Sequence, residues 1–118
     1  MHQTSRAALI ELLFLALYID DRLSLAEDAA LEKALNALGW ESPQPKEIFI
    51  LNAFARAREA SSCEEKTNIF LSQRANVIVA DEESSAAFDW LGKVLAADGV
   101  SMSEARFLEK VQKALFLE

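Results

Sequence analysis

Glycine and proline, the residues that most often interrupt helices, are scarce in this chain, with three glycines and two prolines among 118 residues. Leu, Ala, Glu and Lys, which favour helices, recur throughout the sequence. The segment NVIVA at 76–80 has strand propensity, but a lone strand would have no partner, so we interpret it as the end of a buried helix. The sequence therefore predicts an all-α fold, a compact helical bundle of six or seven helices.

The spacing of apolar residues divides the chain into six helical segments. They are expected over residues 4–18, 24–39, 45–62, 62–80, 81–97 and 101–117, with WESPQPKE as the clearest loop. Gly39 suits a helix end, Pro45 a first helical turn, and Ser62 with Glu65 a capping box. The fourth segment contains Ile69, Phe70 and Val77. The inward-facing residues of the other segments are predicted to be Leu31, Ala34, Leu35, Leu38, Ile48, Leu51, Phe54, Ala55, Phe88, Leu91, Leu95, Phe107, Leu108, Val111 and Leu115.

The N-terminal run AALIELLFLALYI is apolar on nearly every face. It is too short to cross a bilayer of about 30 Å as a helix, and no small-residue cleavage site follows it. We therefore expect neither a signal peptide nor a membrane span, but a helix buried in the middle of the bundle. Glu11 interrupts the run and is interpreted as a solvent-facing residue or as the partner of an arginine such as Arg6.

The composition indicates which partners the protein is expected to bind and in which compartment it is expected to be found. The formal net charge is −7, and no basic stripe stands out, so nucleic acid is excluded as an expected partner. Cys63 is the only cysteine, which rules out an internal disulfide and favours a reducing, cytoplasmic location. No linker or low-complexity segment appears, so residues 1–118 are expected to form a single domain.

One acidic turn occurs twice in the chain, near its start and near its end. Residues 21–38 align without a gap on residues 98–115, and each copy follows an apolar helix. This spacing predicts two related helix–turn–helix halves closed against each other. The matched residues are Asp21, Ser24, Glu27, Leu31, Glu32, Lys33, Ala37 and Leu38 in the first copy, and Asp98, Ser101, Glu104, Leu108, Glu109, Lys110, Ala114 and Leu115 in the second.

Two interpretations of the repeated turn are open. Ser-x-x-Glu is a capping box, which accounts for the serine and the glutamate but only loosely for the aspartate before them. Alternatively, Asp98 and Glu104, with Asp21 and Glu27 as weaker counterparts, supply the oxygen ligands of a divalent cation, most naturally Ca²⁺. Arg22 stands where the second copy has Gly99, and its charge would compete with a cation in the first turn.

The pattern AADG-x-x-x-x-E at 96–104, followed by an amphipathic helix and with a weaker copy near the N-terminus, resembles the TerB-like family of tellurite-resistance proteins. The resemblance implies a compact all-α domain with acidic turns linked to divalent-cation binding. It also implies a non-enzymatic sensor or scaffold role in bacterial stress responses, sometimes at the inner membrane.

The competing hypothesis is an acidic helical module that binds another protein and uses its acidic turns only as caps. No nucleophile–base pair, phosphate-binding glycine loop or histidine cluster is present, so we expect no enzymatic activity.

Overall fold

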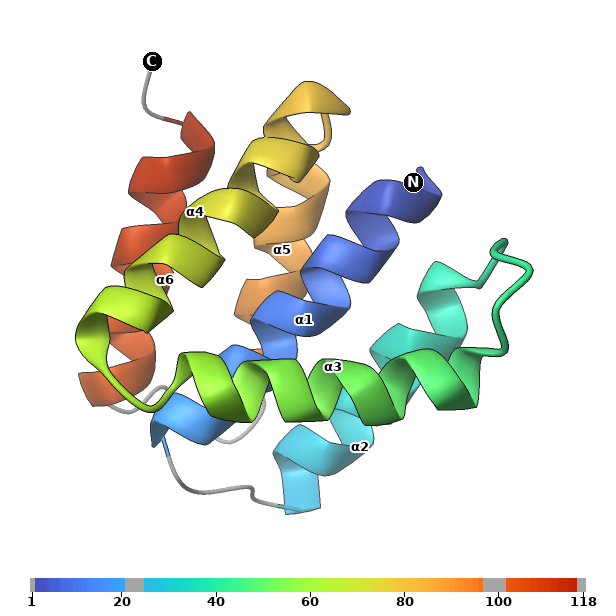
Figure 1. Ribbon diagram of the computed structural model, residues 1–118, viewed down its shortest axis with the longest axis horizontal. Helices are drawn as coiled ribbons and strands as arrows, with labels where there is room; N and C mark the ends of the chain where they lie inside the picture. The colour runs from blue at the N-terminus through green and yellow to red at the C-terminus, as the bar shows by residue number, and fades with distance from the viewer. Residues whose placement is uncertain (1, 21–24, 97–101, 117–118) are drawn as a thin grey trace.

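The computed structural model describes residues 2–20, 25–96 and 102–116, with the backbone alone at residues 20 and 25–28. These residues form helices and no strand, which confirms the predicted all-α fold (Figure 1). The helices are α1 (Gln3–Asp20), α2 (Leu25–Leu38), α3 (Lys46–Ala60), α4 (Glu64–Ala80), α5 (Ser84–Leu95) and α6 (Met102–Phe116). The segment NVIVA at 76–80 is the last part of α4, as predicted, but only Ile78 of this segment is buried, so the prediction of a buried helix end is wrong for its other residues.

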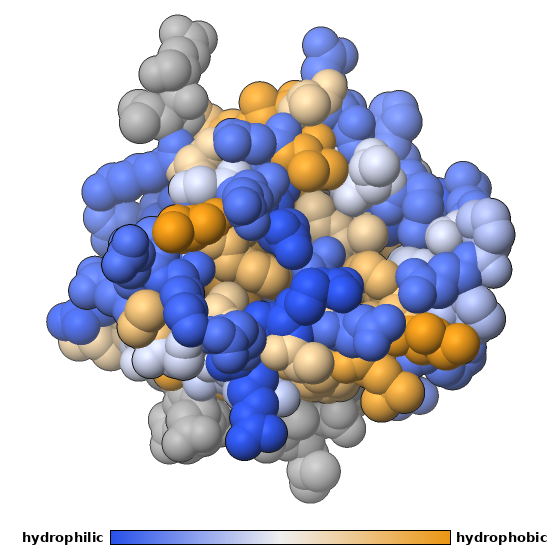
Figure 2. Space-filling view, viewed as in Figure 1, coloured by the Kyte–Doolittle hydropathy of each residue, from blue (hydrophilic) through white to orange (hydrophobic). Residues whose placement is uncertain are grey.

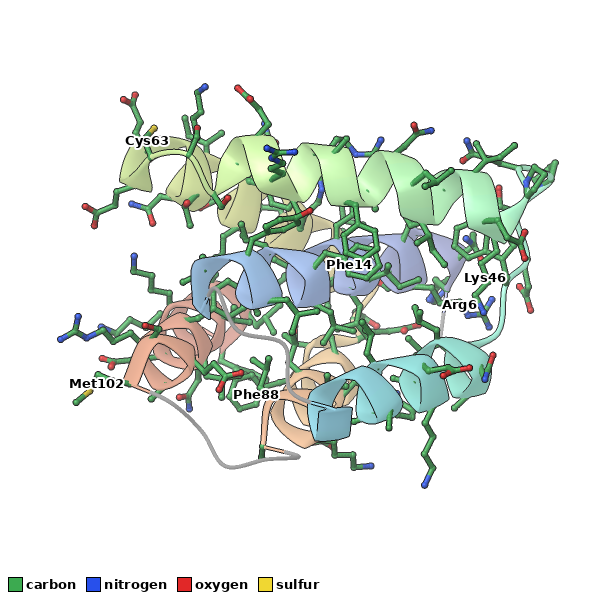
Figure 3. All side chains as sticks on the ribbon, turned by 90° about the horizontal axis from the view of Figure 1, so that it is seen from below. Arg6, Phe14, Lys46, Cys63, Phe88 and Met102 are labelled. Atoms are coloured by element: carbon green, nitrogen blue, oxygen red, sulfur yellow. The ribbon has the colours of Figure 1, made fainter. Side chains whose placement is uncertain are left out.

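Helix α1 is the centre of the molecule, because its apolar residues cover every side of the helix. Every residue from Ala8 to Leu17 is buried, and α1 contacts all five other described helices. It lies between α3 on one side and α2 and α5 on the other (Figure 3). A helix that is apolar all round has to be enclosed in this way, so the predicted central position of this segment is confirmed.

The remaining helices pack on α1 and on one another. Helix α6 contacts α4 and α5, and α2 contacts α5, so α2, α5 and α6 enclose the side of α1 away from α3. The predicted inward residues that are buried are Leu31, Ala34, Leu38, Leu91, Leu95, Phe107, Val111 and Leu115. Leu35, Phe88 and Leu108 are partly buried at the margin of this core, as are Trp40 and Trp90.

Helix α3 packs on α1 through small residues rather than large ones. Ala53, Ala57 and Ala60 are buried, together with Phe49 at the start of the helix. Phe14 points from α1 towards α3 (Figure 3), and its ring stacks against that of Phe54 with a centroid distance of 4.0 Å. The alanines let the two helix backbones approach closely, which fixes which side of α3 faces the core.

The prediction that Ile48, Leu51, Phe54 and Ala55 point inward is therefore wrong, because all four are exposed. Helix α3 carries two apolar stripes, and the prediction chose the stripe with the larger side chains, which packing leaves outside.

The helix ends described here agree with those predicted from local sequence, except for the start of α4. Gly39 has φ of +76° directly after α2, a left-handed conformation suited to glycine at a helix end. The cap of α4 is Cys63, whose Sγ accepts a hydrogen bond from the Lys66 amide at 3.5 Å. The predicted capping box is wrong, because the Ser62 hydroxyl donates instead to the Glu59 carbonyl of the preceding helix.

The helices of the two copies of the repeat begin at equivalent residues. Helix α2 begins at Leu25 and α6 at Met102, which are equivalent positions in the alignment of 21–38 with 98–115. Ala34 and Leu38 are buried at the positions of Val111 and Leu115. Superposition of the two helix–turn–helix units remains a prediction, because both turns lie outside the described residues.

The Cα radius of gyration is 13.0 Å. A compact chain of this length is expected at about 13.5 Å, so the six helices pack as tightly as those of ordinary globular proteins. Among the described helices, none combines the length and the apolar character needed to cross a membrane.

Candidate functional site

The residues predicted to bind a cation are placed only in part. Asp21 and Asp98 lie outside the described residues, and Glu27 is described at the backbone alone. Glu104 lies in the first turn of α6 and is 2% exposed, on the same side of the helix as the buried Phe107 and Val111. Within residues 2–20, 25–96 and 102–116, no three His, Cys, Asp or Glu side chains are grouped in a way that could hold a metal.

A second buried carboxylate, Glu11 of α1, joins three helices. Its Oε2 accepts hydrogen bonds from Nε and Nη2 of Arg74 at 3.1 and 2.9 Å and from Nε of Arg56 at 3.1 Å. The interpretation of Glu11 as an arginine partner is confirmed, but its partners belong to α3 and α4, whereas Arg6 pairs with Glu41 at 3.2 Å. Glu11 therefore fixes the two arginines at the junction of α3 and α4.

At this junction, an open groove of about 490 Å³ lies on the surface between α3 and α4. In the view of Figure 2, hydrophobic side chains lie at the surface over these two helices, with hydrophilic side chains between them. The residues that line the groove are Ala55, Arg56, Glu59, Ala60, Lys66, Ile69, Phe70, Gln73 and Arg74.

The groove combines an apolar lining with positive charge. Phe70 is 8% exposed, Ile69 is 51% exposed, and the guanidinium of Arg74 lies 4.2 Å from the centroid of the Phe70 ring. Lys66 Nζ donates to Glu59 at 2.6 Å, a contact that raises the pKa of Lys66 and lowers that of Glu59. Those two charges therefore neutralise each other.

The two groove arginines share one carboxylate. Arg56 and Arg74 both bind the same oxygen of Glu11, so one positive charge remains after pairing. The Arg56 side chain is 43% exposed, and its terminal nitrogens have no hydrogen-bond partner among the described residues. The groove is thus locally basic in a chain whose net charge is −7.

Next to the groove, α3 presents a row of exposed apolar side chains, formed by Ile48, Leu51 and Phe54, which we call the α3 row. Their exposed fractions are 48%, 71% and 36%. Burying a Leu or Ile side chain contributes about 1.5–3 kcal/mol, so this row leaves a substantial apolar contribution unused in the isolated chain.

At the N-terminal end of α1, polar contacts hold the helix against the turn between α4 and α5. The hydroxyl of Ser5 donates to Asp81 Oδ2 at 2.6 Å, Thr4 donates to the same oxygen, and these bonds hold the pKa of Asp81 below its ordinary value. Glu83 accepts from the backbone amide of His2 at 2.8 Å. This cluster joins the start of α1 to residues distant in sequence, and we assign it a structural role.

The groove and the α3 row were not identified from sequence. A stripe of alanines at 53, 57 and 60 was the available signal, because small residues at this spacing allow close helix contact and so indicate the buried side. The arginines at 56 and 74 gave no local signal, since their carboxylate partner lies on α1.

Comparisons of the chain with protein-family models, with curated proteins and with solved structures find no match.

Proposed function

We propose that this chain is a non-enzymatic binding module whose groove between α3 and α4 receives an apolar, acidic segment of a protein partner. The observation that carries the proposal is the composition of the groove. An apolar lining that includes Ile69 lies beside one uncompensated positive charge, in a chain that is otherwise strongly acidic.

The shape and chemistry of the groove favour an amphipathic helix as the ligand. Helices bind in grooves between two helices by inserting apolar residues spaced three or four positions apart. The ligand's apolar side chains would cover Ile69 and Phe70, and a carboxylate would accept from the terminal nitrogens of Arg56, whose side chain is 43% exposed. Such charge-assisted bonds to arginine add orientation as well as affinity.

A displayed library of helical peptides tests this role. Peptides enriched on the wild-type chain are expected to combine apolar residues at helical spacing with at least one Asp or Glu. Ile69→Asp should weaken their binding by about tenfold or more, because it places a charge in the apolar lining of the groove.

The matched control is Val79→Asp, which changes an exposed valine on the same helix but outside the groove. It should leave peptide affinity unchanged. Failure to enrich any peptide, or equal binding to the Ile69→Asp variant, would overturn the proposed role.

A second candidate function, divalent-cation binding at the acidic turns, is favoured by the burial of Glu104. A carboxylate 2% exposed in the first turn of α6 follows the segment that contains Asp98. In this role the chain would act as the sensor or scaffold that the TerB-like resemblance implies, with Asp98 and Glu104 as principal ligands and Asp21 and Glu27 as weaker ones.

Thermal melting with Ca²⁺, Mg²⁺, Mn²⁺ and Zn²⁺ tests the cation role. A metal that binds only the folded chain raises the melting temperature as its concentration increases. Asp98→Asn, which keeps the turn propensity but removes the charge, should abolish that rise and leave the metal-free melting temperature unchanged. A wild-type midpoint that does not move at millimolar metal would exclude this candidate and leave the groove as the functional site.

A further inference from the structure

The α3 row lies between two opposite charges. Glu47 precedes it and Arg58 follows it, eleven residues later, which is close to three helical turns. Both side chains are therefore on the same side of α3 as Leu51, at points about 16.5 Å apart along the helix axis. Each is exposed, and neither forms an ion pair with another described residue.

The other charged residues of α3 are engaged elsewhere. Lys46 Nζ donates to the Leu35 carbonyl near the end of α2 at 3.1 Å. Arg56 is bound to Glu11, and Glu59 is bound to Lys66. The charges of α3 that remain available to a partner are thus negative at one end of the row and positive at the other.

We infer that the α3 row binds the same row of a second copy of this chain, with the two α3 helices antiparallel about a two-fold axis. A two-fold interface requires a patch that is complementary to itself. The midpoint between Glu47 and Arg58 along the helix coincides with the midpoint between Leu51 and Phe54. An antiparallel pair centred there places Glu47 opposite Arg58 of the second copy, twice, and Leu51 opposite Phe54.

A parallel pair would instead place like charges against each other, which disfavours it. Phe54 is suited to the central position, because one face of its ring is fixed by stacking on Phe14 while 36% of the residue remains exposed. A rigid aromatic side chain of this kind loses little conformational freedom on binding.

The interface formed by one helix row is small, so a reversible dimer is expected rather than an obligate one. The net charge of −7 on each chain also opposes association. This surface lies beside the groove, and the inference does not depend on the groove's proposed function.

Sedimentation equilibrium of the full chain over a range of concentrations, at physiological salt, tests the inference. The wild type is expected to show a concentration-dependent monomer–dimer equilibrium. Glu47→Arg or Arg58→Glu alone should weaken dimerisation by about tenfold, because each converts two attractive pairs into repulsive ones. The double variant E47R/R58E should restore the dimer, since it exchanges the charges while keeping them complementary.

Three further variants distinguish loss of this interface from unfolding, from a change of net charge and from an effect at the groove. Leu51→Asp should abolish the dimer while keeping the wild-type circular dichroism spectrum, because Leu51 is 71% exposed. Glu32→Arg on α2 makes the same change of net charge as Glu47→Arg and should not weaken dimerisation. Ile69→Asp, which tests the groove, should leave the dimer intact. A wild type that stays monomeric at every concentration, or a double variant no stronger than the single ones, would overturn the inference.

Discussion

Burying a carboxylate inside an apolar helix costs several kcal/mol unless the charge is paired and hydrogen-bonded. Glu11 meets this condition only because α3 and α4 each bring an arginine to the same oxygen. The carboxylate is 8% exposed, whereas the side chains of Arg56 and Arg74 are 43% and 21% exposed. The cluster is thus a partly solvated network with its most buried member on the central helix.

At this residue scale, we expect Glu11→Ala to lower the free energy of unfolding by about 2 kcal/mol, measured by urea denaturation. The usual cost of breaking a buried pair is about 3–5 kcal/mol, and the partial exposure of both arginines reduces it. Glu109→Ala is the control, because Glu109 forms an exposed pair with Lys113 at 3.3 Å. It should change the free energy by no more than about 0.5 kcal/mol. Equal effects of the two substitutions would contradict a stabilising role for the Glu11 cluster.

Helix α3 turns mostly small side chains towards the core and several larger ones towards solvent. Two of its three larger aliphatic residues, Ile48 and Leu51, are exposed, while Ala53 and Ala57 are fully buried against the core. Both stripes have helical spacing, so periodicity alone does not distinguish them. The choice is made by the close approach of α3 to α1 and by Phe49, which anchors the buried stripe.

At the element scale, we expect Ala53→Leu to destabilise the fold by about 1–3 kcal/mol, because a larger side chain would force α3 away from the core. Ala55→Leu is the matched substitution on the exposed side of the same helix and should change stability by less than about 0.5 kcal/mol. Denaturation of both variants at concentrations below dimer formation measures the difference. The reverse order would show that the alanine stripe is not the packed side of α3.

At the scale of the whole molecule, two features connect parts of the chain that are distant in sequence. The Glu11 cluster joins α1, α3 and α4, and the Asp81 contacts with Thr4 and Ser5 join the start of α1 to the turn after α4. The hydroxyl bonds lower the pKa of Asp81, so its carboxylate stays ionised to a more acidic pH than an ordinary aspartate and keeps accepting both bonds there. Both connections converge on α1, which is why that helix organises the fold.

The sequence by itself determined the helical class, the approximate ends of the helices and the burial of the N-terminal run. These properties depend on local propensity, on turn residues such as Gly39 and on an apolar segment that leaves no polar side for solvent. It also predicted the two helices that follow the repeated acidic turns, which begin at the equivalent residues Leu25 and Met102.

Only the tertiary structure decided which side of α3 and α4 faces solvent, which arginines Glu11 binds, and that a basic groove lies between those helices. Each of these outcomes depends on contacts between different helices; the Glu11 pairs with Arg56 and Arg74, for example, join residues 45 and 63 positions apart. Local periodicity carries no information about such contacts, because it reports the spacing of side chains along one helix and not the surface of the helix that packs against it.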